Sequence, residues 1–311
     1  MSDEQTRDWP QDMPIVDPHH HLWDLENNRY PWLQQEPPPQ LVCGDIRPIR
    51  HSYLVGDLRA DFGSLPVTKT VHLQCDWDPT DPIGETRWLN RQAYEHGLPT
   101  GIVAYAKLQD HHVAAILDGH LAASGRVRGV RQIMNWHADS MLTFGAPKGL
   151  MRTPEWRRGF AMLAPRGLSF DLQLYSHQMD EADKLAGDFS GTSIVLNHGG
   201  MPVDRSPEGF ALWRKGMRAL ARHDNITVKI SGLGMVDHHW TVDSLRPVVE
   251  EIIAIFGSSR AMFASNFPVD KLYSSYAAVW QAFHTITAAF SADERRALFA
   301  ANAERIYRIK D

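Results

Sequence analysis

The sequence predicts an α/β protein built as a single (β/α)8 TIM barrel. Eight short apolar or alternating runs recur along the chain, each ends in polar residues, and helical patterns lie between them. This alternation is typical of parallel βαβ units, and eight such units close into a barrel more readily than they form an open sheet. The predicted strands are residues 15–21, 68–76, 101–109, 129–135, 169–177, 193–200, 226–232 and 261–268.

Helical periodicity appears between these strands, at residues 84–96, 153–163 and 244–256. The final helix is predicted to open at Ser291-Ala-Asp-Glu294, a capping box in which Ser291 and Glu294 satisfy each other's backbone N–H groups. Two long connections, residues 22–53 and 136–152, follow predicted strand ends. Loops of this length at that edge of a barrel indicate lids that cover a functional pocket.

Length and composition are typical of one globular domain. A chain of 311 residues fits one barrel, so we expect a single domain over residues 1–311 with residues 1–14 as an N-terminal extension. The net charge of -5 and the absence of a basic run argue against a nucleic-acid partner. The two cysteines, the polar N-terminus and the lack of a long apolar stretch predict a cytoplasmic protein without a membrane partner. A small-molecule substrate is the expected partner, and homo-oligomerisation stays open.

Side-chain alternation predicts which residues point into the barrel. In the second, fifth and seventh strands we expect the polar sets to face inward, namely His72, Gln74 and Asp76, then Asp171, Gln173, Tyr175 and His177, then Thr227, Lys229 and Ser231. The first strand places His19 and His21 on one face with Asp17, and His198 ends the sixth on the face of Ile194 and Leu196. Because unpaired polar groups are costly to bury, these sets indicate a solvated pocket.

The segment Asp17-Pro-His-His-His21 is the strongest chemical signal in the chain. A His-x-His pair on a strand aims the imidazoles of His19 and His21 at one point, as metal ligation or polarisation of a carbonyl requires. The structural alternative is a cluster of hydrogen-bonded core histidines. The position of the pair at a strand end of a barrel favours a catalytic pocket.

The same segment, residues 15–24, resembles the opening of the amidohydrolase-2 (amidohydrolase-related) family of the amidohydrolase superfamily. Segments 197–202, 228–233, 262–268 and 302–307 resemble that family's later motifs in the same order. The resemblance covers about residues 15–309 and is closest to the sugar-lactonase branch, which contains L-fuconolactonase, L-rhamnonolactonase and pyrone-dicarboxylate lactonase. It implies a barrel of the metal-dependent-hydrolase type.

The resemblance also implies roles for individual residues. It identifies His19 and His21 as the family's His-x-His pair, His198 as its strand-six histidine and, by strand order, His177 as its strand-five histidine. The strand-eight acid that activates water in the family falls on Asn266. An amide has no useful basicity, so Asn266 can orient a water or bind substrate but cannot be the general base.

Three sources of an activated water therefore stay open. The base is His177 or His198, whose ordinary pKa suits neutral pH, or it is a carboxylate such as Asp76 or Asp270. Alternatively, a divalent metal ion, with zinc the first choice, is held by the His-x-His pair and His177 and lowers the pKa of its water. The branch resembled also includes metal-independent lactonases, so a metal-free site is an equal expectation.

Two cations are predicted inside the barrel. Arg131 and Lys229 suit recognition of a carboxylate or of hydroxyl groups, although a salt bridge to Asp17 or Asp171 is the structural alternative. Aromatic faces pack well against sugar rings, which gives the tryptophans a place in the site. The further substrate-binding candidates are Gln74, Asp76, Trp77, Trp136 and Asp270.

The function expected from these observations is that of a hydrolase. It opens a small sugar-acid or dicarboxylate lactone by attack of water on a carbonyl polarised by histidine. Two alternatives stay open: a decarboxylase or hydratase acting on a small carboxylate, and a ligand-binding barrel that lost its catalytic acid, for which Asn266 is the argument.

Overall fold

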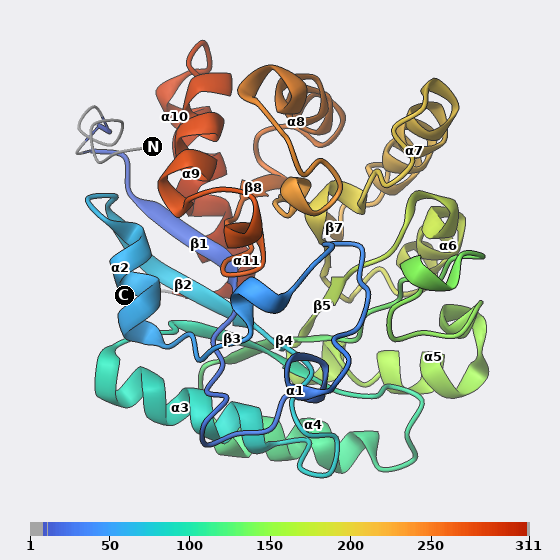
Figure 1. Ribbon diagram of the computed structural model, residues 1–311. Coiled ribbons are helices and arrows are strands. Elements are labelled where there is room, and N and C mark those ends of the chain that lie inside the picture. The colour runs from blue at the N-terminus through green and yellow to red at the C-terminus, as the bar shows by residue number, and fades with distance from the viewer. Residues whose placement is uncertain (1–8, 11, 310–311) are drawn as a thin grey trace.

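A closed barrel of eight parallel strands forms the centre of the molecule (Figure 1). The computed structural model describes residues 9–10 and 12–309. Closure rests on the first and last strands, where His21 N donates to Phe267 O at 2.7 Å and Asn266 N donates to His19 O at 2.8 Å. The predicted (β/α)8 barrel is confirmed. Its strands are β1 (Ile15–His20), β2 (Val67–Leu73), β3 (Gly101–Tyr105), β4 (Val127–Arg131), β5 (Ser169–Leu172), β6 (Ile194–Leu196), β7 (Ile226–Ile230) and β8 (Ala261–Phe263).

Helices surround this sheet (Figure 1). The capping box predicted at Ser291 is confirmed, with Ser291 N donating to Glu294 Oε2 at 2.9 Å. Within the described residues, no helix combines the length and the apolar character that crossing a bilayer requires. The helices are α1 (Pro31–Gln34), α2 (Val55–Phe62), α3 (Gly84–His96), α4 (Val113–Ala123), α5 (Pro154–Phe160), α6 (Met179–Asp188), α7 (Pro207–Leu220), α8 (Val242–Phe256), α9 (Tyr276–Ile286), α10 (Ala292–Arg296) and α11 (Asn302–Tyr307).

The described part of the predicted N-terminal extension packs on the barrel. Trp9 is buried, its Nε1 donates to Met13 O at 2.9 Å, and its ring meets Phe299 edge-on at 5.5 Å. Residues 1–8 and 11 of that extension lie outside the described residues.

Several strands end earlier than predicted. β5 ends at Leu172 instead of residue 177, and β6 ends at Leu196 instead of residue 200. Short 3₁₀ turns at Ser176–Gln178 and His198–Gly200 follow these strands. In the second turn His198 has φ of +54°, a conformation that no extended strand allows. Alternation therefore fails for side chains beyond the observed strand ends.

The inward face of β2 is opposite to the predicted one. Val71 and Leu73 share an apolar cluster with Val195 of β6. Because β2 and β6 are not neighbours in the sheet, their side chains meet only across the barrel interior. His72 instead places its Nε2 3.3 Å from the carbonyl oxygen of Leu22. Residues 70–73 are buried on both faces of the strand, so polar character did not mark the inward face there.

The prediction that Asp17 shares a face with His19 and His21 is also wrong. The Asp17 carboxylate accepts hydrogen bonds from Ser265 Oγ at 2.6 Å and from Tyr276 Oη of α9 at 3.0 Å, so it faces the helix layer. The pairing of β1 with β2 shifts register between Asp17 and His20. This irregularity offsets the alternation that a regular strand would keep.

Lys229 of β7 forms a salt bridge inside the barrel. Its Nζ lies 2.7 Å from Asp171 Oδ1, and both side chains are fully buried. The same oxygen accepts from Tyr307 Oη at 2.8 Å and from Asn197 Nδ2 at 3.0 Å. The substrate-binding role predicted for Lys229 therefore gives way to the structural alternative, in which its charge is neutralised within the core.

We predict that Lys229→Met lowers the free energy of unfolding by about 3–5 kcal/mol, because it leaves the Asp171 carboxylate buried without its cation. Adding Asp171→Asn removes that charge, so the double variant should recover much of the loss. Urea unfolding of the three proteins measures both effects. Equal destabilisation of the single and double variants would contradict a buried ion pair.

Candidate active site

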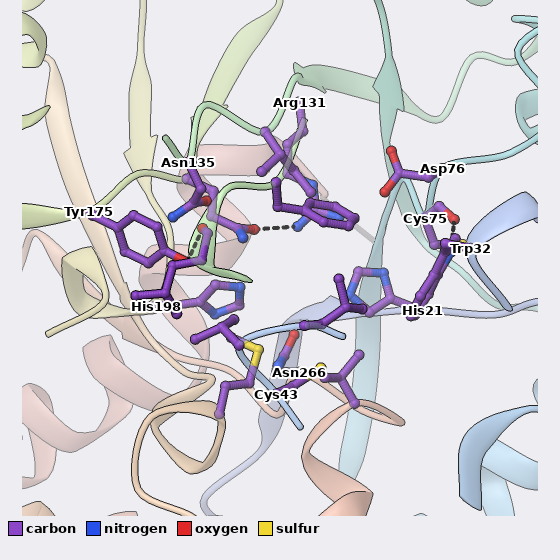
Figure 2. Close-up of a pocket in the computed structure, with 18 of the residues that line it drawn as sticks. His21, Trp32, Cys43, Cys75, Asp76, Arg131, Asn135, Tyr175, His198 and Asn266 are labelled. Carbon is purple, nitrogen blue, oxygen red and sulfur yellow. Dashed lines mark hydrogen bonds between the residues drawn. The ribbon is translucent and has the colours of Figure 1, made fainter. Parts of the chain in front are cut away.

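A pocket of about 690 Å³, including the part open to solvent, lies at the carboxyl ends of the strands (Figure 2). Residues at the ends of β4, β5, β6 and β8 and the His-x-His segment meet there, as is general for catalytic pockets of this fold. We call the polar residues that line its base the pocket floor. They are His21, Arg131, Gln173, His198 and Asn266.

The predicted His-x-His pair is brought together at this floor, which His21 itself lines. The rings of His19 and His21 have centroids 5.2 Å apart, and the His19 ring lies 4.5 Å from that of His198. His21 Nδ1 lies 2.8 Å from the carbonyl oxygen of Leu73. A carbonyl only accepts, so Nδ1 carries the proton and Nε2 of the neutral ring keeps a lone pair.

His198 reaches the floor through a turn and not through strand alternation. Its φ of +54° departs from the strand that ends at Leu196, on whose face alternation had placed it. Its Nδ1 lies 3.0 Å from Ser231 Oγ. Gly232, with φ of +61°, leaves room for the ring, because a Cβ at Gly232 would stand 2.4 Å from His198 Nδ1.

All three of these histidines are neutral at neutral pH. Burial lowers the pKa of His19, His21 and His198 well below the usual value of 6.5. For His21 and His198 the next cause is the positive charge of Arg131. Neutral imidazoles can accept a proton or a hydrogen bond, and a lowered pKa makes each ring a weaker base than free imidazole.

Arg131, at the end of β4, is the buried cation of the floor. Its guanidinium donates to Gln173 Oε1 at 3.1 Å and to the backbone carbonyl of Gln74. Its Nη1 also lies 3.5 Å from His19 Nε2. Because a guanidinium only donates, these acceptors fix its plane and orient His19. The carboxyl of Asp76, also in the pocket lining, attracts the same charge.

Asn266 and Asp270 form a hydrogen-bonded pair after β8. Asn266 Nδ2 donates to Asp270 Oδ2 at 2.6 Å, which leaves the Asn266 side-chain oxygen as an acceptor. Figure 2 shows that oxygen directed toward His21 and His198. Burial raises the pKa of Asp270 to about 7, although the hydrogen bonds from Asn266 and from the Gly234 backbone oppose the rise. Asp270 thus acts behind Asn266 and does not line the pocket.

Other predicted site residues lie elsewhere. His177 and Trp136 line a second pocket, with ring centroids 5.9 Å apart, because the turn after β5 carries His177 away. Gln173 takes the strand-five position in the main pocket. Trp77 packs edge-on against Tyr30 at 5.2 Å and is not among the described lining residues. Gln74 contributes through its backbone carbonyl to Arg131.

Sequence reasoning missed the apolar part of the lining. These side chains come mainly from residues 22–53 and 136–152, the two connections expected to act as lids. Loop length was the available signal, but loops lack the periodicity that shows which side chains turn inward. We call the following residues the apolar wall: Leu41, Val42, Ile133, Met141, Leu142 and Phe144.

Comparisons with known proteins agree with this geometry. The sequence profile described as amidohydrolase matches residues 16–309. The chain is 52% identical over 298 residues to uncharacterized protein y4mH of Sinorhizobium fredii, covering 96% of this chain and 99% of that one. It is 23% identical over 308 residues to the L-fucono-1,5-lactonase of Burkholderia multivorans, covering 95% and 96%. A solved amidohydrolase of Burkholderia multivorans with bound zinc has a TM-score of 0.79 at 22% identity, covering 95% of this chain and 99% of that one.

We predict that buried neutral histidines make the fold acid-sensitive. Burial lowers the pKa of His20 to about 3, so its contribution to stability is complete above pH 6.5 and is lost as the pH falls toward 3. His20→Gln should therefore reduce the loss of unfolding free energy between pH 7 and pH 5 by about 1–2 kcal/mol. Chemical unfolding at both pH values measures this difference. The exposed His111→Gln serves as control, and identical pH dependence in all three proteins would contradict the account.

Proposed function

Because the chain belongs to the amidohydrolase family, we propose that it is a hydrolase that opens a small lactone by attack of water on the ring carbonyl. The observation that carries the proposal is the buried Arg131 guanidinium beside neutral His21 on one pocket floor. The relative named L-fucono-1,5-lactonase supports the reaction class. An activated cyclic ester suits such a site, because its hydrolysis requires only a cation to stabilise the carbonyl oxygen and a base to activate water.

Arg131 polarises the carbonyl in this mechanism. As water attacks, negative charge develops on the carbonyl oxygen, and a fixed guanidinium in a buried pocket stabilises that charge strongly. The bonds from Arg131 to Gln173 and to the Gln74 carbonyl hold the cation in place before substrate arrives. Little reorganisation is then needed during the reaction.

His21 and Asn266 position and activate the water. The Nε2 lone pair of His21 accepts one proton of the water. The Asn266 side-chain oxygen accepts a hydrogen bond from the second O–H group of the same water. The water oxygen bonds to the carbonyl carbon, and the resulting imidazolium returns its proton to the ring oxygen as the C–O bond breaks. The product is the open hydroxy acid, with atoms and protons balanced.

A divalent metal does not fit the residues of this floor. A structurally similar amidohydrolase binds zinc, so we asked whether this floor can also hold the ion. The third metal ligand predicted for this chain, His177, lies in another pocket. The strand-eight carboxylate is replaced by Asn266, and the Arg131 cation stands 3.5 Å from His19 Nε2. A dication there would face a guanidinium, and the strand-eight position would offer it an amide in place of a carboxylate.

The donor atoms that do converge in the described part of the chain lie outside the floor. They belong to His72, Cys75 and Glu85, and they lie within 4.8 Å of one another. The Cys75 thiol donates to Glu85 Oε1 at 3.0 Å and lies 3.8 Å from His72 Nε2. The mechanism above uses none of them.

The proposed function is tested by acid release from a panel of uncharged, sugar and dicarboxylate lactones. We predict ring opening of at least one class, and a loss of about 100-fold or more in kcat/KM for Arg131→Gln, which keeps hydrogen-bond donors but removes the charge. Exposed Arg29→Gln is the matched control. No acid release across the panel would sink the proposal, and carbon dioxide release from a carboxylate panel would then favour the decarboxylase alternative.

We predict that Asn266→Asp lowers kcat by about 10-fold to 100-fold at pH 8. The new carboxyl group would stand at the 2.6 Å contact with Asp270, where two adjacent carboxyl groups cannot both be ionised. The double variant Asn266→Asp with Asp270→Asn restores one donor and one acceptor, and should fold as stably as the wild type. A large gain in activity for the single variant would instead indicate a barrel that had lost its catalytic acid.

We predict that the purified protein carries well below one divalent ion per chain and that chelator leaves its lactonase activity unchanged. The reason is that the positive charge of Arg131, beside His19 Nε2, would repel a divalent ion from that ligand nitrogen. Elemental analysis and assays before and after chelation check this. One zinc per chain together with activity lost on chelation and regained with zinc would overturn the metal-free mechanism.

A further inference from the structure

The pocket has a polar floor but an apolar wall. The apolar wall is built mainly by residues on the two long connections, with Leu41 and Val42 from the first and Leu142 and Phe144 from the second. It lines the same pocket as Arg131, which binds the reacting carbonyl in the proposed mechanism. A substrate body that extends away from the carbonyl therefore meets mainly hydrocarbon.

The two lining aromatics with polar atoms turn those atoms toward the backbone. Trp32 Nε1 donates to the Cys75 carbonyl at 2.9 Å, and Tyr175 Oη donates to the Leu142 carbonyl at 2.7 Å (Figure 2). Each ring thus offers the pocket its apolar surface. The lining residue Asn135 differs from these rings, because its buried side-chain oxygen has no partner and can accept a hydrogen bond from one hydroxyl.

The charge of the pocket is close to balanced. Arg131 is the one lysine or arginine among the described lining residues, and the Asp76 carboxyl lines the same pocket. Lys229, the second predicted cation, is committed to Asp171 in the core. A dicarboxylate would therefore bring two negative charges to one cation that already faces a carboxyl group.

Resting on the proposed lactone hydrolysis, we infer that the substrate is an uncharged lactone with an apolar body, either fused to an aromatic ring or carrying an alkyl chain. A polyhydroxylated sugar lactone would bury several hydroxyls against the apolar wall without partners, and each such group lowers affinity roughly 10-fold. A pyrone dicarboxylate would place its carboxylates where no second cation lies.

The test compares dihydrocoumarin and an alkyl δ-lactone with gluconolactone and pyrone dicarboxylate. For each, kcat/KM is divided by the rate of hydroxide-catalysed opening, which removes differences in intrinsic reactivity. We expect the apolar lactones to exceed the other two by about 30-fold or more. Phe144→Ser should lower kcat/KM for dihydrocoumarin about 10-fold, and an equal loss for gluconolactone would contradict an apolar contact with the fused ring. Tyr94→Ser, at a side chain 90% exposed on α3, is the control and should change neither value.

Binding separates this inference from the proposed reaction. The unreactive lactam dihydroquinolinone has the shape of dihydrocoumarin, and calorimetry measures its affinity beside that of gluconolactam. Preference for dihydroquinolinone without opening of any lactone would support the apolar site and reject the lactonase. Faster opening of gluconolactone or pyrone dicarboxylate would reject the inference and keep the lactonase. Failure of dihydroquinolinone to bind and of dihydrocoumarin to react would also overturn the inference.

Discussion

The buried guanidinium of Arg131 is the constraint on which the rest of the site depends. A charge inside a barrel is stable only with acceptors around it, and the Gln74 carbonyl, the Gln173 amide and His19 Nε2 supply them. The same charge helps to keep the neighbouring imidazoles neutral. It also stands where a metal ion would otherwise approach His19. One side chain thus contributes to the protonation states of the floor and organises its hydrogen bonding.

Much of the barrel was predictable because it rests on repetition. Eight strand patterns, the capping box at Ser291 and the position of the His-x-His pair each follow from local sequence with a known period or spacing. The failures have local causes. The irregular pairing after Asp17 and the turn that follows β5 interrupt alternation, and no composition marks them. As a result His177 lines the second pocket, whereas Gln173 of the same predicted inward set lines the main one.

The contrast between floor and wall links the fold to its chemistry. The ends of the strands hold the polar floor, where barrel geometry limits movement. The apolar wall comes mainly from loops, whose sequence can change without altering a barrel. A protein at 22% identity can therefore share the fold while its loops select another substrate. Asn266 fits the same division, because its hydrogen bond to Asp270 keeps an acceptor on the floor without adding charge.

The most direct test of this account is a crystal structure of the protein with bound dihydroquinolinone. The account predicts the lactam carbonyl oxygen within about 3 Å of an Arg131 guanidinium nitrogen and the fused ring packed on the apolar wall beside Phe144. A lactam carbonyl bound to a metal ion held by His19 and His21, or turned away from Arg131 toward solvent, would contradict it.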